Sequence, residues 1–212
     1  MNPRALFLAA CMALSLHSPP AHATTLAPLT DDQMVDASSY IVEGTITEIW
    51  VEFDDQDMIW TRARVAVDRT FKGPDTPNEL VIDSMGGRIG DAQMSVPSSA
   101  RFSQGEHVVL FLADIRNGTR LTPVGMELGK YTIRRAPGTT TQLVQRFPVP
   151  DAEFYDHRFV PYPAPGERRD LTDLEQTIQH RLAVGWDGKP IVGLSPERLT
   201  ALNTPTMRRI TR

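Results

Sequence analysis

The sequence predicts a mainly β fold: a small antiparallel barrel of five or six strands, with a short N-terminal helix and a C-terminal packing helix. Short runs rich in β-branched and aromatic residues follow one another between residues 40 and 135. Most are separated by turns typical of hairpins, with one long connection between the third and fourth strands. The apolar phase of the first run slips by one residue, which is typical of a bulged, strongly curved strand.

Residues 1–23 have the pattern of a signal peptide. Arg4 precedes an apolar run from Ala5 to Leu16, and Ala21-His22-Ala23 matches an A-x-A cleavage site. We therefore expect an exported protein that is periplasmic or secreted after cleavage near Ala23. No other run approaches the roughly 18 apolar residues of a membrane span. The "LAAC" ending at Cys11 also resembles a lipoprotein box. A lipid anchor there is the less favoured alternative, because little apolar sequence precedes it.

Loss of this segment changes the composition. Cys11 is the only cysteine, so the mature chain is expected to have neither disulfide nor thiolate chemistry. Arg4 leaves and no acid does, so the formal net charge falls from −4 to −5. Such an acidic chain has no basic field for polyanions, and we expect no nucleic-acid partner.

The first elements follow from local patterns. Thr30 and Gln33 form a capping-box pattern, which predicts a helix over 31–37. The first strand, "YIVEGTITEIWVEF", changes phase after Ile46. The second strand, within 58–71, alternates between apolar and charged residues, and "LVID" forms the third. Between the first two strands, "DDQD" at 54–57 lacks the spacing of a calcium loop and predicts a solvated turn.

The segment "DSMGGRIGDAQMSVP", residues 83–97, contains closely spaced glycines after a strand. A phosphate loop would open a helix and carry Lys-Ser or Lys-Thr, and neither follows. The G-x-x-G at 87–90 matches a nucleic-acid clamp that joins two helices, whereas a strand precedes it here. We interpret the glycines as positive-φ or bulge positions where the barrel wall turns into its long connection. Arg88, at the tip, is a candidate contact.

The later elements complete the prediction. "HVVLFL" at 107–112 is apolar without alternation, which predicts a central strand covered on both faces. A hairpin at Asn117-Gly118 and a strand in "KYTIRR" follow. Residues 24–147 thus form the predicted barrel domain. Residues 148–212 form a Pro- and aromatic-rich segment followed by helices, one in "DLTDLEQTIQHRLA" and a short one in "PERLTALN". The longer helix has a second possible capping box, Thr172 to Glu175, and one apolar stripe: Leu171, Leu174, Ile178 and Leu182.

Several of these segments together resemble a known family. "IVEGTI", "FKG", "LVI", the Gly-Gly-x-x-Gly segment and "VPSSARFSQGEHVVLFL" are similar to the OB-type barrel domain of uncharacterised secreted bacterial proteins, over roughly Thr30 to Arg134. That domain is distantly similar to the netrin-like barrel of tissue inhibitors of metalloproteinases. The resemblance implies an OB-like barrel and, as an alternative function, inhibition of a secreted metalloprotease. Those inhibitors present an N-terminal cysteine to the protease zinc, whereas Thr24 is the expected mature N-terminus here.

No catalytic, cofactor-binding or metal-ligating residue is predicted. The mature histidines, His107, His157 and His180, lack the spacing of a metal site. No G-x-S-x-G elbow exists, and the serines of "SVPSSARF" are interpreted as turn formers. Glu43 and Glu48 are expected to face solvent. We therefore expect a non-enzymatic binding or structural module of the bacterial envelope or secretome, with a hydrolase whose site is dispersed in sequence as a further alternative.

The predicted contact residues lie on the first hairpin. Trp50, Trp60, Arg62 and Arg64 are candidates to line a ligand-binding face, as aromatics do on OB-type barrels. The favoured alternative is structural, with both tryptophans closing the hairpin as a cross-strand pair. The expected partner is a protein or a component of the cell envelope.

Overall fold

The computed structural model describes residues 25–26, 29–75, 77–115, 120–146, 153–155, 161–162, 167–191 and 194–203. The helices are α2 (Asp31–Ala37), α3 (Leu171–Val184) and α4 (Pro196–Asn203), with a 3-10 turn, η1 (Met126–Gly129). The strands are β1 (Thr25–Leu26), β2 (Tyr40–Phe53), β3 (Ile59–Lys72), β4 (Glu79–Met85), β5 (Gly87–Ile89), β6 (Ala92–Met94), β7 (His107–Ile115), β8 (Arg120–Pro123), β9 (Lys130–Arg135), β10 (Gln142–Arg146), β11 (Glu153–Tyr155), β12 (Pro161–Tyr162) and β13 (Glu167–Asp170).

One antiparallel sheet dominates the fold. Its order is β13-β10-β9-β7-β2-β3-β4, and β8 pairs with β7 beside β9. The prediction of a mainly β, antiparallel fold is confirmed. The hydrogen-bonded path is open among the described strands, because it ends at β13 on one side and at β4 on the other. The sheet also has more strands than the five or six predicted, since β10 and β13 extend it beyond β9.

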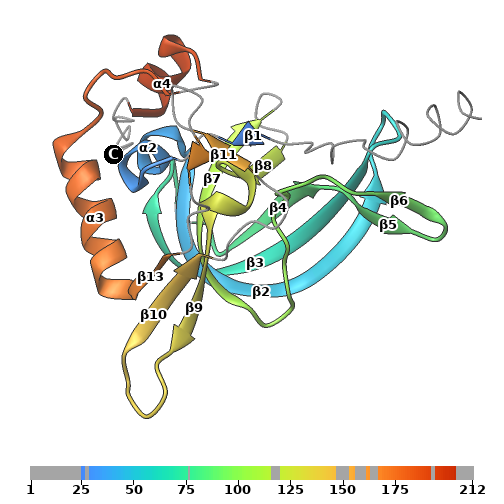
Figure 1. The fold of residues 1–212 in the computed structure, drawn as a ribbon, viewed down its shortest axis with the longest axis horizontal. Coiled ribbons are helices and arrows are strands. Elements are labelled where there is room, and N and C mark those ends of the chain that lie inside the picture. The colour runs from blue at the N-terminus through green and yellow to red at the C-terminus, as the bar shows by residue number, and fades with distance from the viewer. Residues whose placement is uncertain are drawn as a thin grey trace, which may run out of the picture.

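Strands β2 and β3 form a long curved ribbon that sweeps across the molecule (Figure 1). Their pairing shifts register in three places, one of them between Ile46 and Glu48. This is where the apolar phase of the sequence slips, so the predicted bulge is confirmed. A bulge increases local twist, which lets one continuous ribbon bend around a core.

Strand β7 separates two cores. Val108, Leu110 and Leu112 pack into one cluster with residues of β2, β3 and β4. Val109 and Phe111 pack into the other, beneath the helices. All five side chains are fully buried, which confirms the predicted central strand covered on both faces.

The helices gather on one side of the sheet (Figure 1). Helix α2 has the predicted bounds and the predicted capping box between Thr30 and Gln33. In α3, the first three residues of the predicted stripe are buried, but Leu182 is 37% exposed and Arg181 turns inward instead. The second capping box is wrong, since α3 begins at Leu171 and its N-cap residue, Asp170, makes no side-chain cap bond. Helix α4 matches the predicted last helix.

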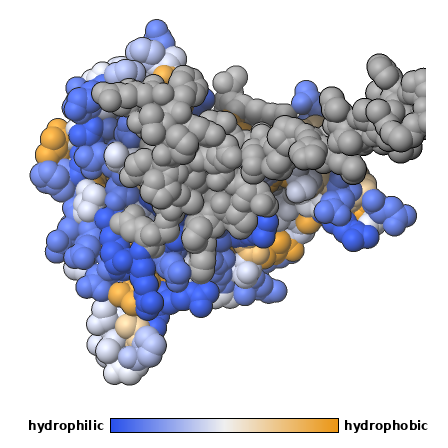
Figure 2. All heavy atoms as spheres, in the orientation of Figure 1, coloured by the Kyte–Doolittle hydropathy of each residue, from blue (hydrophilic) through white to orange (hydrophobic). Residues whose placement is uncertain are grey.

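The remaining strands form two small sheets. β1 pairs in parallel with β11, which pairs with β12, and β5 pairs with β6 in a hairpin that projects from the body (Figure 1). The visible described surface is mostly hydrophilic, with scattered hydrophobic side chains (Figure 2). Within the described ranges, no helix is long and apolar enough to cross a membrane. The signal peptide with Cys11, Thr24, the Asn117-Gly118 turn and His157 lie outside the described residues.

Candidate binding site

Strands β4 and β8 lie side by side at one end of the curved sheet, although no ladder of backbone hydrogen bonds is found between them among the described residues. Two cavities open beside β4, of about 270 Å³ and about 180 Å³. Four residues line both: Ser84, Met85, Ser99 and Ala100. The end of β4 therefore separates two adjoining hollows.

The glycine segment shapes the larger hollow. Gly86 and Gly87 have φ angles of +102° and +146°, and a Cβ added to Gly87 would lie 2.7 Å from Val51 Cγ1. Thr61 Oγ1 donates to the Gly86 carbonyl at 2.7 Å. The prediction of positive-φ glycines at this bend is confirmed. Sequence analysis did not predict the β5–β6 hairpin that follows, whose turn contains Gly90 at φ +57°.

Two serine hydroxyls fasten the segment around Ser98 to the edge of β4. Ser84 Oγ donates to the Ala100 carbonyl at 2.7 Å, and Ser99 Oγ donates to the Met85 carbonyl at 2.5 Å. The two Oγ atoms are 2.7 Å apart. The two hydroxyls have two protons between them for these three contacts, and the two carbonyls are the backbone acceptors. The bonds of Ser99 are thus tertiary contacts, rather than the local turn bonds that the sequence indicated.

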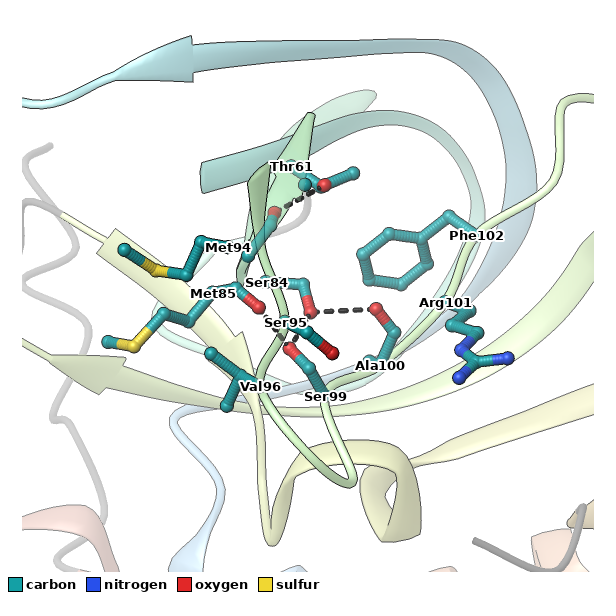
Figure 3. Close-up of a pocket in the computed structure, with 12 residues that line it drawn as sticks. Thr61, Ser84, Met85, Met94, Ser95, Val96, Ser99, Ala100, Arg101 and Phe102 are labelled. Carbon is teal, nitrogen blue, oxygen red and sulfur yellow. Dashed lines mark hydrogen bonds between the residues drawn. The ribbon is translucent and has the colours of Figure 1, made fainter. Parts of the chain in front are cut away.

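The lining of the larger hollow combines apolar and polar groups. In Figure 3 the hydroxyls of Ser84 and Ser99 lie between the methionines on one side and the ring of Phe102 on the other. The apolar lining residues include Met85, Met94, Val96 and Phe102, and the hydroxyls belong to Thr61, Ser84, Ser95 and Ser99. Ligand sites are concave and bring apolar surface together with polar groups that fix orientation, and this hollow has both in similar measure.

The smaller hollow adjoins a buried ion cluster. Arg120 on β8, only 8% exposed, lies 3.3 Å from Asp83 on β4 and 3.6 Å from Asp54, measured from its nitrogens to their carboxylate oxygens. Its guanidinium also stacks 4.3 Å from the ring centre of Trp60. Burial raises the pKa of Asp83, while the positive charges of Arg62 and Arg120 oppose that rise. The cluster joins β4 to β8 through side chains.

Residues 55–57 form the predicted turn and are exposed, but Asp54 differs from the prediction of a solvated turn at 54–57. Its side chain is only 2% exposed. Oδ1 accepts from the backbone N–H groups of Gln56 and Met58, both at 2.9 Å, and Oδ2 accepts from the indole of Trp60 at 3.0 Å. The carboxylate organises the loop and continues into the ion cluster, because its partner Arg120 lies far along the chain.

The structure brings Trp50, Trp60, Arg62 and Arg64 onto one face of the β2–β3 ribbon. Trp50 lies opposite Arg62, and Trp60 lies opposite Glu52, so the predicted tryptophan pair is wrong. The two rings are diagonal neighbours because the pairing register places a charged residue across from each.

Internal contacts occupy most of these four side chains. Trp60 is 3% exposed, and Arg62 lies 3.2 Å from Glu52 and 3.1 Å from Asp83. Arg64 pairs with Glu48 at 2.9 Å and with Glu79 at 2.5 Å, over the ring of Trp50. Of the four, only Trp60 lines a described hollow, the smaller one.

Two further predicted positions differ from one another. Arg88 is exposed on the β5–β6 hairpin, where its Nε donates to the Gly90 carbonyl at 3.0 Å, and it lines neither hollow. Glu43 does not face solvent as expected. It is buried between Arg69 at 2.7 Å and His107 at 3.2 Å, whereas Glu48 is exposed.

Metal chemistry receives no support from the placement of side chains. No cluster of three or more His, Cys, Asp or Glu suited to a metal is present in the part of the chain that the structure describes. His107 approaches Glu43 and Asp68 through the same nitrogen, Nε2, at 3.2 and 3.6 Å. His180 lies on the exposed side of α3.

Sequence analysis missed Asp83, Arg120 and the serine pair. Asp83 follows the apolar run "LVI" within a strand, where an acid is buried only if it is paired with a cation. Nothing in the sequence near Arg120 indicates its partners, because they are distant in the chain. Asp83, for example, precedes it by 37 residues.

No protein-family model and no curated protein matches this chain.

Proposed function

We propose that this protein is an exported, non-enzymatic binding module that holds part of a protein or cell-envelope partner in the larger hollow beside β4. The observation that carries the proposal is the lining, in which apolar side chains from β4, β6 and the segment after it alternate with a similar share of polar groups, four of them hydroxyls. The hydroxyls of Ser84 and Ser99 hydrogen-bond to each other and to backbone carbonyls, which favours a structural role over a nucleophilic one. A hydrolase is therefore the weaker alternative.

The proposal includes an OB-like barrel as the scaffold. Strands β2, β3, β4, β8 and β7 surround the core cluster that contains Val42, Ile82 and Leu110. The adjacency of β4 and β8 and the ion pair between Asp83 and Arg120 support closure through side chains at the one missing ladder. The resemblance to netrin-like domains has the same support. Inhibition of a metalloprotease depends on Thr24, which lies outside the described residues, and stays a prediction.

A blocked hollow tests the proposed function. Ser95 lines the hollow and is exposed, so Ser95→Trp fills the hollow without opening the core. Gln93→Trp is the matched control, because Gln93 is exposed on β6 two residues away and lines neither hollow. The chain from Thr24 and both variants are immobilised and exposed to envelope extract of the source organism, and captured components are quantified by mass spectrometry.

We expect the unmodified chain and Gln93→Trp to capture one component saturably. Ser95→Trp should capture at least about tenfold less of it, because the indole blocks the contacts that give the partner its affinity. Capture of nothing above a bare-matrix control, or equal capture by both variants, would overturn the proposal.

A further inference from the structure

A third cavity, of about 530 Å³, lies on the helix-covered side of the sheet, away from the hollows described above. Residues of α2, α3, α4 and the ends of β3 and β7 line it. Its ionisable lining residues are Asp36, Tyr40, Lys72, Asp114 and Arg181. Lys72 is the last residue of β3.

The amine of Lys72 has two neutral oxygen acceptors. Nζ donates to the Val35 carbonyl at 2.8 Å and to Asn203 Oδ1 at 3.1 Å. Across the described ranges, no carboxylate lies within ion-pair distance of Nζ. An ammonium has three N–H donors, whereas a neutral amine has two and a lone pair. The two acceptors therefore match the neutral amine and leave its lone pair free.

The charged groups around the cavity do not provide an ion-pair partner for this amine. Asp36, the nearest source of negative charge, is held by Arg181, with Nη2 and Oδ2 2.6 Å apart. Tyr40 donates to Asp75 at 3.1 Å. Burial lowers the pKa of Lys72 to about 8, against the opposing influence of Asp36. A substantial fraction of the amine is thus neutral near pH 8.

The chain contains two other lysines, which provide internal controls. Lys130 is buried, but its Nζ lies 3.3 Å from carboxylate oxygens of both Glu106 and Glu127. Lys189 is 82% exposed and pairs with Asp187 at 3.0 Å. Of the three lysines, Lys72 alone combines a cavity with neutral acceptors.

We propose that Lys72 is a nucleophilic site that captures a small aldehyde in this cavity as an imine. The lone pair of Nζ attacks the carbonyl carbon, a C–N bond forms, and the carbonyl oxygen takes a proton to give a carbinolamine. The nitrogen then loses its remaining proton as the hydroxyl leaves as water, and a C=N bond results. The amine and the aldehyde yield the imine and one water, so no oxidant or reductant takes part.

The experiment compares the three lysines within one molecule. The folded chain is treated with propanal and cyanoborohydride, which reduces each imine to a stable propyl amine, and the modified fraction of each lysine is measured by peptide mass spectrometry over time. At pH 7.5 we expect Lys72 to react about tenfold faster than Lys189, or more, because more of its amine is neutral. Above pH 10 the ratio should fall towards one.

Two variants of α3 test whether the cavity admits the aldehyde. Leu182 lines the cavity, so Leu182→Trp should slow modification of Lys72 at least about fivefold while leaving Lys189 unchanged. Val184→Trp is the matched control, because Val184 is 65% exposed and lies outside the lining. Circular dichroism confirms that both variants are folded.

The proposal fails if Lys72 reacts no faster than Lys189 at pH 7.5 in the folded chain. It also fails if Leu182→Trp leaves the rate at Lys72 unchanged. Either result would make Lys72 a structural tie between α2 and α4. Neither result bears on capture of a partner at the hollow beside β4, which is measured separately.

Discussion

The two ends of β3 bury positive charge in different ways. Near its start, Arg120 lies beside Trp60 and is paired with Asp83 and Asp54. At its end, Lys72 is half-buried against two neutral oxygens. A guanidinium cannot give up its proton in a protein, so burial there requires carboxylates. An amine can lose its proton, and the cavity beside Lys72 accommodates it without a carboxylate.

This difference assigns different tasks to the two ends. Paired ions between β4 and β8 hold two strands that lack a backbone ladder among the described residues. The unpaired amine leaves a reactive group beside an open volume. The first arrangement is expected to dominate stability, and the second to dominate the dependence of stability on pH.

Removal of the arginine at the first end should have the largest effect. Arg120→Met leaves Asp83 and Asp54 buried without their shared cation, and we expect the free energy of unfolding to fall by about 3 kcal/mol or more. Urea denaturation followed by tryptophan fluorescence measures this. Arg64→Met is the control and should cost much less, since that guanidinium is open to solvent. Equal losses in the two variants would contradict a special role for the β4–β8 cluster.

The lysine at the second end should make stability depend on pH. The pKa of Lys72 is about 8 in the folded chain, below the ordinary 10.5, so between these values the unfolded chain binds more protons. Its contribution to the free energy of unfolding should therefore rise by about 2 kcal/mol from pH 7 to 9.5. The measurement is the difference between the unmodified chain and Lys72→Met at each pH. Lys189→Met should show no such trend, and a flat difference for Lys72→Met would refute the assignment.

A side chain added at Gly87, beside the larger hollow, should lower the free energy of unfolding by a smaller amount. Gly87→Ala places a Cβ 2.7 Å from Val51 Cγ1 at a positive φ, and we expect a loss of about 2 kcal/mol. Gly90→Ala has no neighbour within 4 Å and should cost about 1 kcal/mol, from its φ of +57° alone. Thermal denaturation of both variants separates close packing from conformational strain. The opposite order would show that Gly87 does not lie against Val51 of the β2–β3 ribbon.

The smallest expected effect concerns the serine pair. Ser99→Ala removes the hydroxyl that donates to the Met85 carbonyl, with an expected cost of about 1 kcal/mol. Ser95→Ala should be neutral, because Ser95 is exposed. If Ser99→Ala is also neutral in urea denaturation, the segment around Ser98 is not held to β4 by this bond.

Local patterns predicted the elements whose causes are local. The α2 helix follows from its capping box, the bulge of β2 from its phase slip, and the central position of β7 from its continuous apolar run. Each depends on residues within a few positions of one another, so one sequence contains the necessary information.

The errors concern partners that are distant in sequence. Asp54 is predicted to be solvated because its partner, Arg120, lies 66 positions later. Glu43 is predicted to be exposed because its partners, Arg69 and His107, come from neighbouring strands. Arg181 replaces Leu182 at the buried edge of α3 because Asp36 on α2 attracts it. The residues next to Lys72 in the sequence do not indicate its environment, since α2 and α4 supply its hydrogen-bond acceptors. Tertiary context decides the environment of such polar residues.

The burial of β7 on both faces also affects the rate at which its amides exchange hydrogen with solvent. Its amides from Val108 to Leu112 lie between two packed clusters and between strands on both edges, so they exchange with solvent only when both clusters open together. Smaller fluctuations at the hollow beside β4, or at the cavity beside Lys72, leave this strand protected. Opening of β7 to solvent is thus expected only when the whole chain unfolds.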